Sequence, residues 1–348
     1  MGDANRGNII RSDRSETGAD IKAAQSDVAQ GDAITRRPRR LESRPFWKRS
    51  DFRIALDLAM LLLPSWILPE RLWAPLCRAT MHKSSSTKRR GIKNNAETIR
   101  VALDEADVAR SEAIALELKV GVQELRLQDL RGWRPGGWSP KIVVEGEEHL
   151  RSALAGGSGA ILWVAPFVFN SAPTKIALHQ KGHRVSHLSS PKHGFSETEF
   201  GVKFLNRIRC VPEDRYLAAR IVFDRNLPST AMRRMMRALK AGEVVSIVAA
   251  STEGSDMVQG PIFGGRLPVA VGAPRLAALT GAPLLPLFTV RDPDAGFRIV
   301  IEAPIALASD QSSDERCIAA TTEFLRRSEP WVRQYPGQWR AWSKWRRN

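Results

Sequence analysis

The 348-residue sequence is poor in cysteine: Cys77, Cys210 and Cys317 are scattered along the chain and odd in number. A secreted domain held by disulfides and a zinc site built on cysteine pairs both need more thiols at shorter spacing. The composition therefore excludes a disulfide framework and a cysteine-based zinc centre, and it favours a reducing, cytosolic setting.

The sequence also lacks an apolar run of the roughly 20 residues that span a bilayer. Its most apolar run, 54–68, is shorter and is interrupted by Asp57 and Pro64. Basic residues and tryptophans flank this run, as they do in helices that lie among the headgroups of an anionic membrane. We expect a membrane-associating interfacial or re-entrant helix at 54–68; an amphipathic helix packed on the core is the alternative.

Residues 1–45 have no sustained apolar period and carry a basic run at 36–40. A segment of this composition buries too little apolar surface to fold, so we expect a disordered polar and basic tail. No apolar stretch follows the first basic residues closely, and a cleaved signal peptide is therefore not expected.

Acidic side chains are outnumbered, since 37 Asp and Glu stand against 53 Lys and Arg and leave a formal net charge of +16. Such a charge favours anionic partners, which include phospholipid headgroups, phosphorylated glycolipid, an acidic carrier protein and nucleic acid. No nucleic-acid-binding motif accompanies the charge, so we expect an anionic membrane surface and no nucleic acid. The apolar content of 43% is sufficient for a sizeable core.

Strand-like and helix-like segments alternate after residue 140, which predicts an α/β domain over 141–304 with a central, mainly parallel sheet flanked by helices. A helical segment, 46–140, precedes this domain, and a C-terminal helical region, 305–348, follows it. A short strand and turn are predicted at 142–146, and further strands at 159–165, 184–188, 244–248, 283–290 and 297–301. The predicted helices between them include 231–240, 273–279 and one through His149, Leu150 and Leu154 that stops at 156–157.

The end of the chain, 331–347, combines aromatic and basic residues. On a helix, Trp339, Trp342 and Trp345 would share one face, and such a stripe is typical of a membrane interface. Packing of the indole rings in the core and stacking on single-stranded nucleic acid are the alternatives.

Three of the six histidines, His179, His183 and His187, have the spacing of metal ligands on one helical face. Gly182 is expected to end the helix that holds His179, which separates this histidine from the other two. No acidic or cysteine ligand is near, and we expect no metal site.

Four groups of residues occur in a characteristic order: 144–150 with 153–154 and the strand 159–164, then 239–245, then 261–266 with 272–286, and finally the Pro-x-Gln-Trp-x-x-Trp ending, 336–342. This order resembles the bacterial lauroyl/myristoyl acyltransferases of lipid A biosynthesis, within the lysophospholipid acyltransferase superfamily. The likeness covers most of the chain after the tail. It implies a glycerolipid acyltransferase-like fold at the cytoplasmic face of the cell inner membrane. The implied reaction passes a fatty acyl chain from acyl-carrier protein, or acyl-CoA, to a hydroxyl of a lipid A-like glycolipid or lysolipid, with no cofactor.

The family's His-x4-Asp/Glu motif is degenerate here, because the resemblance places Pro166 at the histidine and Ser171 at the carboxylate. Loss of a positioned general base typically costs about 10²–10⁴ in rate. Two histidines, His149 and His193, are candidates for a displaced base, and the alternative for each is an ordinary exposed or core histidine. Function is thus open between an acyltransferase and a catalytically inactive relative that binds lipid or a partner at the membrane.

The same resemblance suggests residues that contact the substrate. Thr252–Ser255 is weakly similar to the Glu-Gly-Thr block that glycerolipid acyltransferases use near phosphate, and an ordinary polar loop is the alternative. Glycines allow close backbone approach, and arginines beside them suit an anionic group. The substrate-binding candidates are Phe167, Asn170, Glu253, Gly254, Gly264, Gly265, Arg266 and Arg275.

Overall fold

The computed structural model describes residues 34–36, 45–82, 86–190, 193–223, 228–249, 256–292 and 296–348. Most of the predicted tail, the loop that contains Glu253 and Gly254, and the 293–295 turn lie outside these residues. Within the predicted tail, Thr35–Arg36 forms the short strand β1, which pairs with β7.

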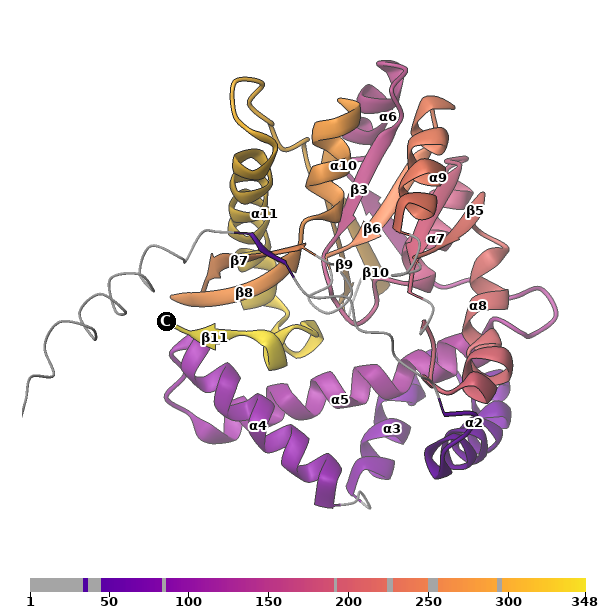
Figure 1. The fold of residues 1–348 in the computed structure, drawn as a ribbon. Helices are drawn as coiled ribbons and strands as arrows, with labels where there is room; N and C mark the ends of the chain where they lie inside the picture. The colour runs from indigo at the N-terminus through magenta and orange to yellow at the C-terminus, as the bar shows by residue number, and fades with distance from the viewer. Residues whose placement is uncertain are drawn as a thin grey trace, which may run out of the picture.

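A seven-stranded sheet forms the centre of the molecule, in the order β2-β10-β9-β3-β6-β4-β5 (Figure 1). Its pairs are parallel except for β9 with β10, which confirms the predicted mainly parallel sheet. The strands are β2 (Ile142–Glu145), β3 (Ala160–Val164), β4 (Val185–Ser189), β5 (Ala219–Val222), β6 (Val244–Val248), β9 (Leu284–Asp292) and β10 (Gly296–Ile301).

Helices cover both faces of this sheet. Its central strand β3 is apolar at every position, so the side chains on both of its faces need to be buried. Ile161 and Trp163 pack on one face, while Leu162 and Val164 belong to a separate apolar cluster on the other. Side chains of α9 (Pro228–Lys240), α10 (Gly272–Thr280) and α11 (Ser313–Gln334) join the first cluster, and those of α6 (Glu147–Ala155) and α7 (Ala172–Gln180) join the second. The alternation of the strand thus divides the core into two layers.

A second sheet of four short strands stands apart from the first. It runs β1-β7-β8-β11 and is antiparallel throughout, with β7 (Asp256–Ile262), β8 (Gly265–Ala270) and β11 (Arg346–Arg347). Phe263 and Gly264 turn β7 into β8, both at positive φ, as a two-residue hairpin turn requires. The sequence did not predict this sheet.

The N-terminal helices form a layer below the sheet in the view of Figure 1. This layer consists of α2 (Arg49–Ile67), the short helix η1 (Glu70–Leu72), α3 (Trp73–His82), α4 (Ser86–Leu103) and α5 (Val108–Arg131). α5 contacts α2, α3, α4 and the C-terminal turn η3 (Pro336–Gln338), so it joins the layer to the rest of the fold. No helix within the described ranges combines the length and the apolar character that a membrane crossing needs.

The helix α2 confirms the predicted helix at 54–68 and has two distinct faces. One face buries Leu58, Leu61 and Ser65. The other exposes a row of large apolar side chains to solvent: Phe52, Leu56, Met60, Leu62, Leu63, Trp66 and Ile67. The helix is therefore amphipathic and packs on the core by one face alone. Its association with a membrane remains a prediction.

The prediction of an aromatic stripe on a C-terminal helix was wrong. Pro336 and Gly337 follow directly on α11, and the chain continues as the 3₁₀ turns η3 and η4 (Trp342–Lys344). Trp339, Trp342 and Trp345 are all buried. The indole of Trp342 donates to the carbonyl of Pro336 at 2.8 Å, and that of Trp345 donates to the carbonyl of Ile262 at 2.9 Å. Core packing, the alternative considered above, is what the structure shows.

Candidate active site

The loop after β3 carries Pro166 and is held by the C-terminal motif. The carbonyl of Pro166 accepts from the amide of Arg340 at 3.0 Å, and the amide of Val168 donates to the carbonyl of Gln338 at 2.8 Å. Phe167 is fully buried, with its ring 5.1 Å from that of Trp339. The motif 336–342 therefore clamps the loop after β3, to which the resemblance assigns the histidine of the family, and the structure places Phe167 in the core.

The side chain of Gln338 adds a second clamp. Its Oε1 accepts from the amide of Arg291 at 2.7 Å, and its Nε2 donates to the carbonyl of the same residue at 2.8 Å. Both bonds reach the end of β9, next to β3 in the sheet. Asn170, a predicted substrate contact, donates instead to the carbonyl of Ala165 at 3.0 Å.

Ser171, to which the resemblance assigns the position of the carboxylate, contacts a carboxylate from another part of the chain. Its hydroxyl donates to Oε1 of Glu213, on α8 (Arg207–Asp214), at 2.5 Å. Lys175, one turn along α7, donates to the same hydroxyl at 3.1 Å. A buried acid is thus present beside the expected position, supplied by α8 rather than by the loop.

Glu213 is the centre of a buried ionic cluster. Its Oε2 lies 2.6 Å from Nζ of Lys175, 2.9 Å from Nη2 of Arg220 and 3.0 Å from Nε2 of His193. Burial by itself would raise the pKa of Glu213, but the charge of Lys175 and the contacts with His193 and Arg220 hold it well below its usual range. The carboxylate is therefore ionised at neutral pH.

His193 is the one predicted displaced base that the structure brings to this cluster. Burial lowers the pKa of His193, and the neighbouring Glu213 opposes that shift only in part. The imidazole is therefore neutral at pH 7. When Nε2–H donates to Glu213, Nδ1 is left as an acceptor. The side chain is 23% exposed, so the ring is reachable from solvent.

Further polar side chains extend the cluster along the sheet edge. Nη1 of Arg220 donates to Ser189 at 3.1 Å, and His187 lies 3.2 Å from the hydroxyl of Ser246. Ser171 follows β3 and Ser189 ends β4, so the cluster lies at the carboxyl edge of these parallel strands. This edge is where open α/β sheets commonly bind their ligands.

Helix α5 contributes a second buried ion pair beside the cluster. Asp129 lies 2.8 Å from Nη2 of Arg209, on α8. Burial raises the pKa of Asp129 to about 6, although the charge of Arg209 opposes the shift. Asp129, Arg209 and Glu213 line a cavity of about 10 Å³.

His149 lies at the other edge of the sheet. It belongs to α6, which precedes β3, and a side chain at Gly146 would contact both His149 and the carbonyl of Ile301. In the strand order, β2 and β10 lie on one side of β3, whereas β4 and β5, which carry Ser189 and Arg220, lie on the other. The structure therefore separates His149 from Ser171 and Glu213.

The other predicted anion contacts have local structural partners. Gly264 makes the hairpin turn, and Gly265 allows close approach of Arg346, whose carbonyl would lie 2.4 Å from an added Cβ. Arg266 donates to the carbonyl of Gln259 at 3.1 Å. Arg275 pairs with Asp256 at 2.6 Å and with Asp314 at 2.8 Å. None of these contacts includes a residue of the Glu213 cluster, so their role in substrate binding remains a prediction.

Sequence reasoning missed Glu213, Lys175 and Arg220. These residues lie on three elements, α7, α8 and β5, so no local spacing joins them. In the part of the chain that the structure describes, no three His, Cys, Asp or Glu side chains are arranged to hold a metal ion.

The comparison with protein families locates the resemblance. Residues 199–346 match the family described as bacterial lipid A biosynthesis acyltransferase, which confirms the resemblance read from the sequence over this segment. The matched segment contains Glu213, the strands β7 and β8 and the C-terminal clamp; Pro166, Ser171 and His193 precede it. No curated protein matches the chain. The match supports a lipid acyltransferase-like role.

Proposed function

We propose that this chain transfers a fatty acyl group from a carrier thioester to a hydroxyl of a lipid A-like glycolipid or lysolipid, with His193 as the base. The observation that carries the proposal is the pair of His193 Nε2 and Glu213 Oε2 at 3.0 Å. This pair reproduces the imidazole and carboxylate that Pro166 and Ser171 fail to supply, and Ser171 is bonded to the same Glu213.

The chemistry follows from the charges. Neutral His193 accepts the proton of the acceptor hydroxyl as the oxygen attacks the thioester carbonyl, and ionised Glu213 stabilises the imidazolium that forms. The new ester C–O bond replaces the C–S bond, and the imidazolium returns its proton to the leaving thiolate. The thioester is already activated, so no cofactor is needed. Acyl-carrier protein and acyl-CoA are both suitable donors.

The surface of α2 supports a location at a membrane. Its exposed apolar row is preceded by Phe46 and Trp47, which are 68% and 55% exposed. The amide of Phe200 donates to the carbonyl of Phe46 at 2.9 Å, which brings the exposed Phe204 to the same side. Exposed basic residues lie among these rings, namely Lys48, Arg49, Arg53, Lys203 and Arg207. Apolar rings among cations suit an anionic leaflet, and we place the protein at the cytoplasmic face of the inner membrane.

A second candidate function is lipid binding without turnover. It is favoured by Lys175 and Arg220, which contact the same carboxylate as His193. A buried carboxylate that is surrounded by several cationic partners is also typical of a purely structural ion cluster. Under this candidate the chain retains the membrane surface of the family and has lost its chemistry.

Acyl transfer can be assayed with the purified full chain, labelled acyl-carrier protein or acyl-CoA, and vesicles that contain a lipid A precursor or a lysophospholipid. We expect wild-type turnover, a loss of about 100-fold or more in His193→Ala, and no change in His149→Ala. His193→Gln keeps a donor toward Glu213, so it should fold like the wild type and remain inactive.

Two outcomes would reject the base role. Full activity in His193→Ala places the base elsewhere. An inactive wild type together with an active Pro166→His/Ser171→Glu variant establishes the second candidate, because it shows a substrate site that lacks only its dyad.

A further inference from the structure

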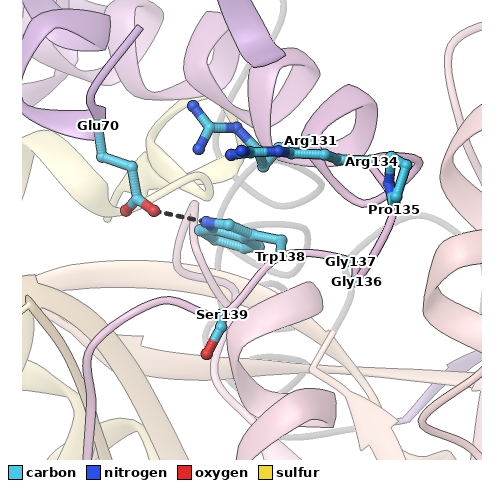
Figure 2. A pocket seen from close by; sticks show the side chains of 8 residues that line it. All are labelled: Glu70, Arg131, Arg134, Pro135, Gly136, Gly137, Trp138 and Ser139. Carbon is cyan, nitrogen blue, oxygen red and sulfur yellow. Dashed lines mark hydrogen bonds between the residues drawn. The ribbon is translucent and has the colours of Figure 1, made fainter. Parts of the chain in front are cut away.

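A pocket of about 260 Å³ lies between η1 and the C-terminal end of α5 (Figure 2). It is distinct from the cavity beside Glu213, although Trp138 lines both. Its lining combines charged, aromatic and glycine residues: Glu70, Arg131, Arg134, Pro135, Gly136, Gly137, Trp138 and Ser139.

Both signs of charge are present in this pocket and do not neutralise each other. Figure 2 shows Arg131 and Arg134 extending in the same direction, toward the side of the pocket that holds Glu70. In the described part of the chain, no ion pair joins Glu70 to either arginine. Oε1 of Glu70 accepts from the indole of Trp138 at 2.7 Å, which leaves Oε2 available.

The two arginines differ in their contacts within the chain. Arg131 is held by the chain itself, since its Nη2 donates to the carbonyl of Leu68 at 2.5 Å, its Nε donates to the carbonyl of Ser65, and its guanidinium lies 4.9 Å from the ring of Trp73. Arg134 is exposed, and its guanidinium makes no hydrogen bond within the described ranges. Burial lowers the pKa of Arg131, and the nearby charge of Arg134 adds to this effect while Glu70 opposes it. Two neighbouring guanidinium groups favour an anion between them.

The position of the pocket suggests the source of its ligand. The carbonyls that bind Arg131 belong to the C-terminal end of α2, where the exposed Trp66 and Ile67 complete the apolar row. Indole rings commonly settle at headgroup depth in a bilayer. A lipid whose chains meet the α2 face would therefore present its headgroup at this opening.

We infer that this pocket binds the headgroup of a zwitterionic phospholipid, with the phosphate at Arg134 and Arg131 and the ammonium group at Glu70. The inference rests on the membrane contact proposed above and adds a headgroup site to it. A purely anionic headgroup would leave Oε2 of Glu70 without a cationic partner, and the charge of Glu70 would repel it. A headgroup with a phosphate and a primary amine satisfies both sides of the pocket.

The inference can be tested by calorimetric titration of the full chain with soluble headgroups, which need neither a membrane nor acyl transfer. The probes are glycerophosphoethanolamine, glycerol phosphate and inorganic phosphate. We expect glycerophosphoethanolamine to bind most tightly. Arg134→Gln and Glu70→Gln should each weaken its binding about tenfold, as the loss of one charged hydrogen bond predicts. Arg71→Gln, on the same turn but outside the pocket, is the matched control and should bind like the wild type.

The same variants can be compared by sedimentation with phosphatidylcholine vesicles that contain phosphatidylethanolamine or phosphatidylglycerol. A lipid headgroup site predicts that Arg134→Gln and Glu70→Gln lose the preference for phosphatidylethanolamine. Equal binding of phosphate and glycerophosphoethanolamine, with no effect of Glu70→Gln, would show a plain anion site and overturn the zwitterion assignment. Absence of binding by every soluble probe would overturn the site, whereas an inactive acyltransferase assay would leave these results unchanged.

Discussion

Two segments of this chain combine tryptophan with basic residues, but the aromatic rings of one are exposed and those of the other are buried. In residues 46–67 the rings of Phe46, Trp47 and Phe52 are exposed, and one whole face of α2 is apolar and in contact with solvent. In residues 331–347 Trp339, Trp342 and Trp345 are buried. Composition alone would assign both segments to a membrane surface.

The difference arises from backbone geometry. The first segment is one regular helix, which can bury only one face, so the apolar residues of the other face remain exposed. The second segment is broken by Pro336 and Gly337 into short turns, which lets each indole find its own carbonyl or ring partner. A regular helix with apolar residues on both faces thus keeps one apolar face exposed, whereas an irregular backbone can bury each aromatic ring separately.

Helix α5 lies between the two segments and contacts both. Asp57 of α2 pairs with Arg126 of α5 at 2.8 Å, and the indole of Trp66 donates to the carbonyl of Leu130 at 3.0 Å. On the other side, Gly337 leaves room for Glu117. Substitutions in α2, in α5 and in the C-terminal segment therefore test how strongly the two segments differ in their contribution to stability and in their exposure.

The largest expected effect is on the buried segment. Trp342→Ala should reduce the free energy of unfolding by about 3–5 kcal/mol, because it leaves a cavity and removes the hydrogen bond to Pro336. Guanidinium chloride denaturation measures the change. Trp47→Ala, in the exposed segment, is the control and should cost less than about 0.5 kcal/mol. Equal losses would contradict the contrast between the two segments.

The next effect concerns the pH dependence of stability through α5. The folded pKa of Asp129 is about 6 and its ordinary value is 3.8, so the folded state binds the proton more tightly. Stability should therefore fall as pH rises from about 4 to 6, by roughly 3 kcal/mol if Asp129 acted alone. Urea denaturation across this pH range should show a smaller decline in Asp129→Asn than in the wild type. An identical slope in both proteins would show that Asp129 does not titrate there.

A smaller effect is expected at the anchor of α2. Asp51 is buried and accepts from Ser196 at 2.5 Å and from Thr198 at 2.8 Å. Asp51→Ala leaves these hydroxyls unpaired and should cost about 2 kcal/mol. Thermal unfolding measures the loss, and Asp51→Asn should recover part of it by keeping an acceptor.

The smallest effect on stability should accompany a large effect on membrane binding. Leu56→Ser/Leu63→Ser changes two exposed positions, and the free energy of unfolding should stay within about 0.5 kcal/mol of the wild type. Vesicle sedimentation should fall at least about tenfold, since each leucine contributes more than 1 kcal/mol when buried in lipid. Leu58→Ser, on the buried face, should lower the free energy of unfolding and leave vesicle sedimentation unchanged. Unchanged sedimentation of the double variant would refute a membrane role for this face.

Much of the central fold was predictable, because its signals are local. The wholly apolar run of β3, the glycines that end α6 and α7, and the alternation of strands with helices led to a parallel sheet with nearly correct bounds. The hairpin β7–β8 was missed, because Phe263 at positive φ has no sequence signature. The candidate site was predictable only in part: His193 was named, but its partner Glu213 was not.

Residue order alone determined the periodicities and the amphipathic character of α2, since each depends on neighbours within a few positions. The tertiary structure brought Ser171 and His193 to the carboxylate of Glu213, buried the C-terminal tryptophans and placed Glu70 opposite Arg134. These outcomes depend on how helices approach the sheet edge, and that geometry follows from packing between residues far apart in the chain rather than from any local pattern.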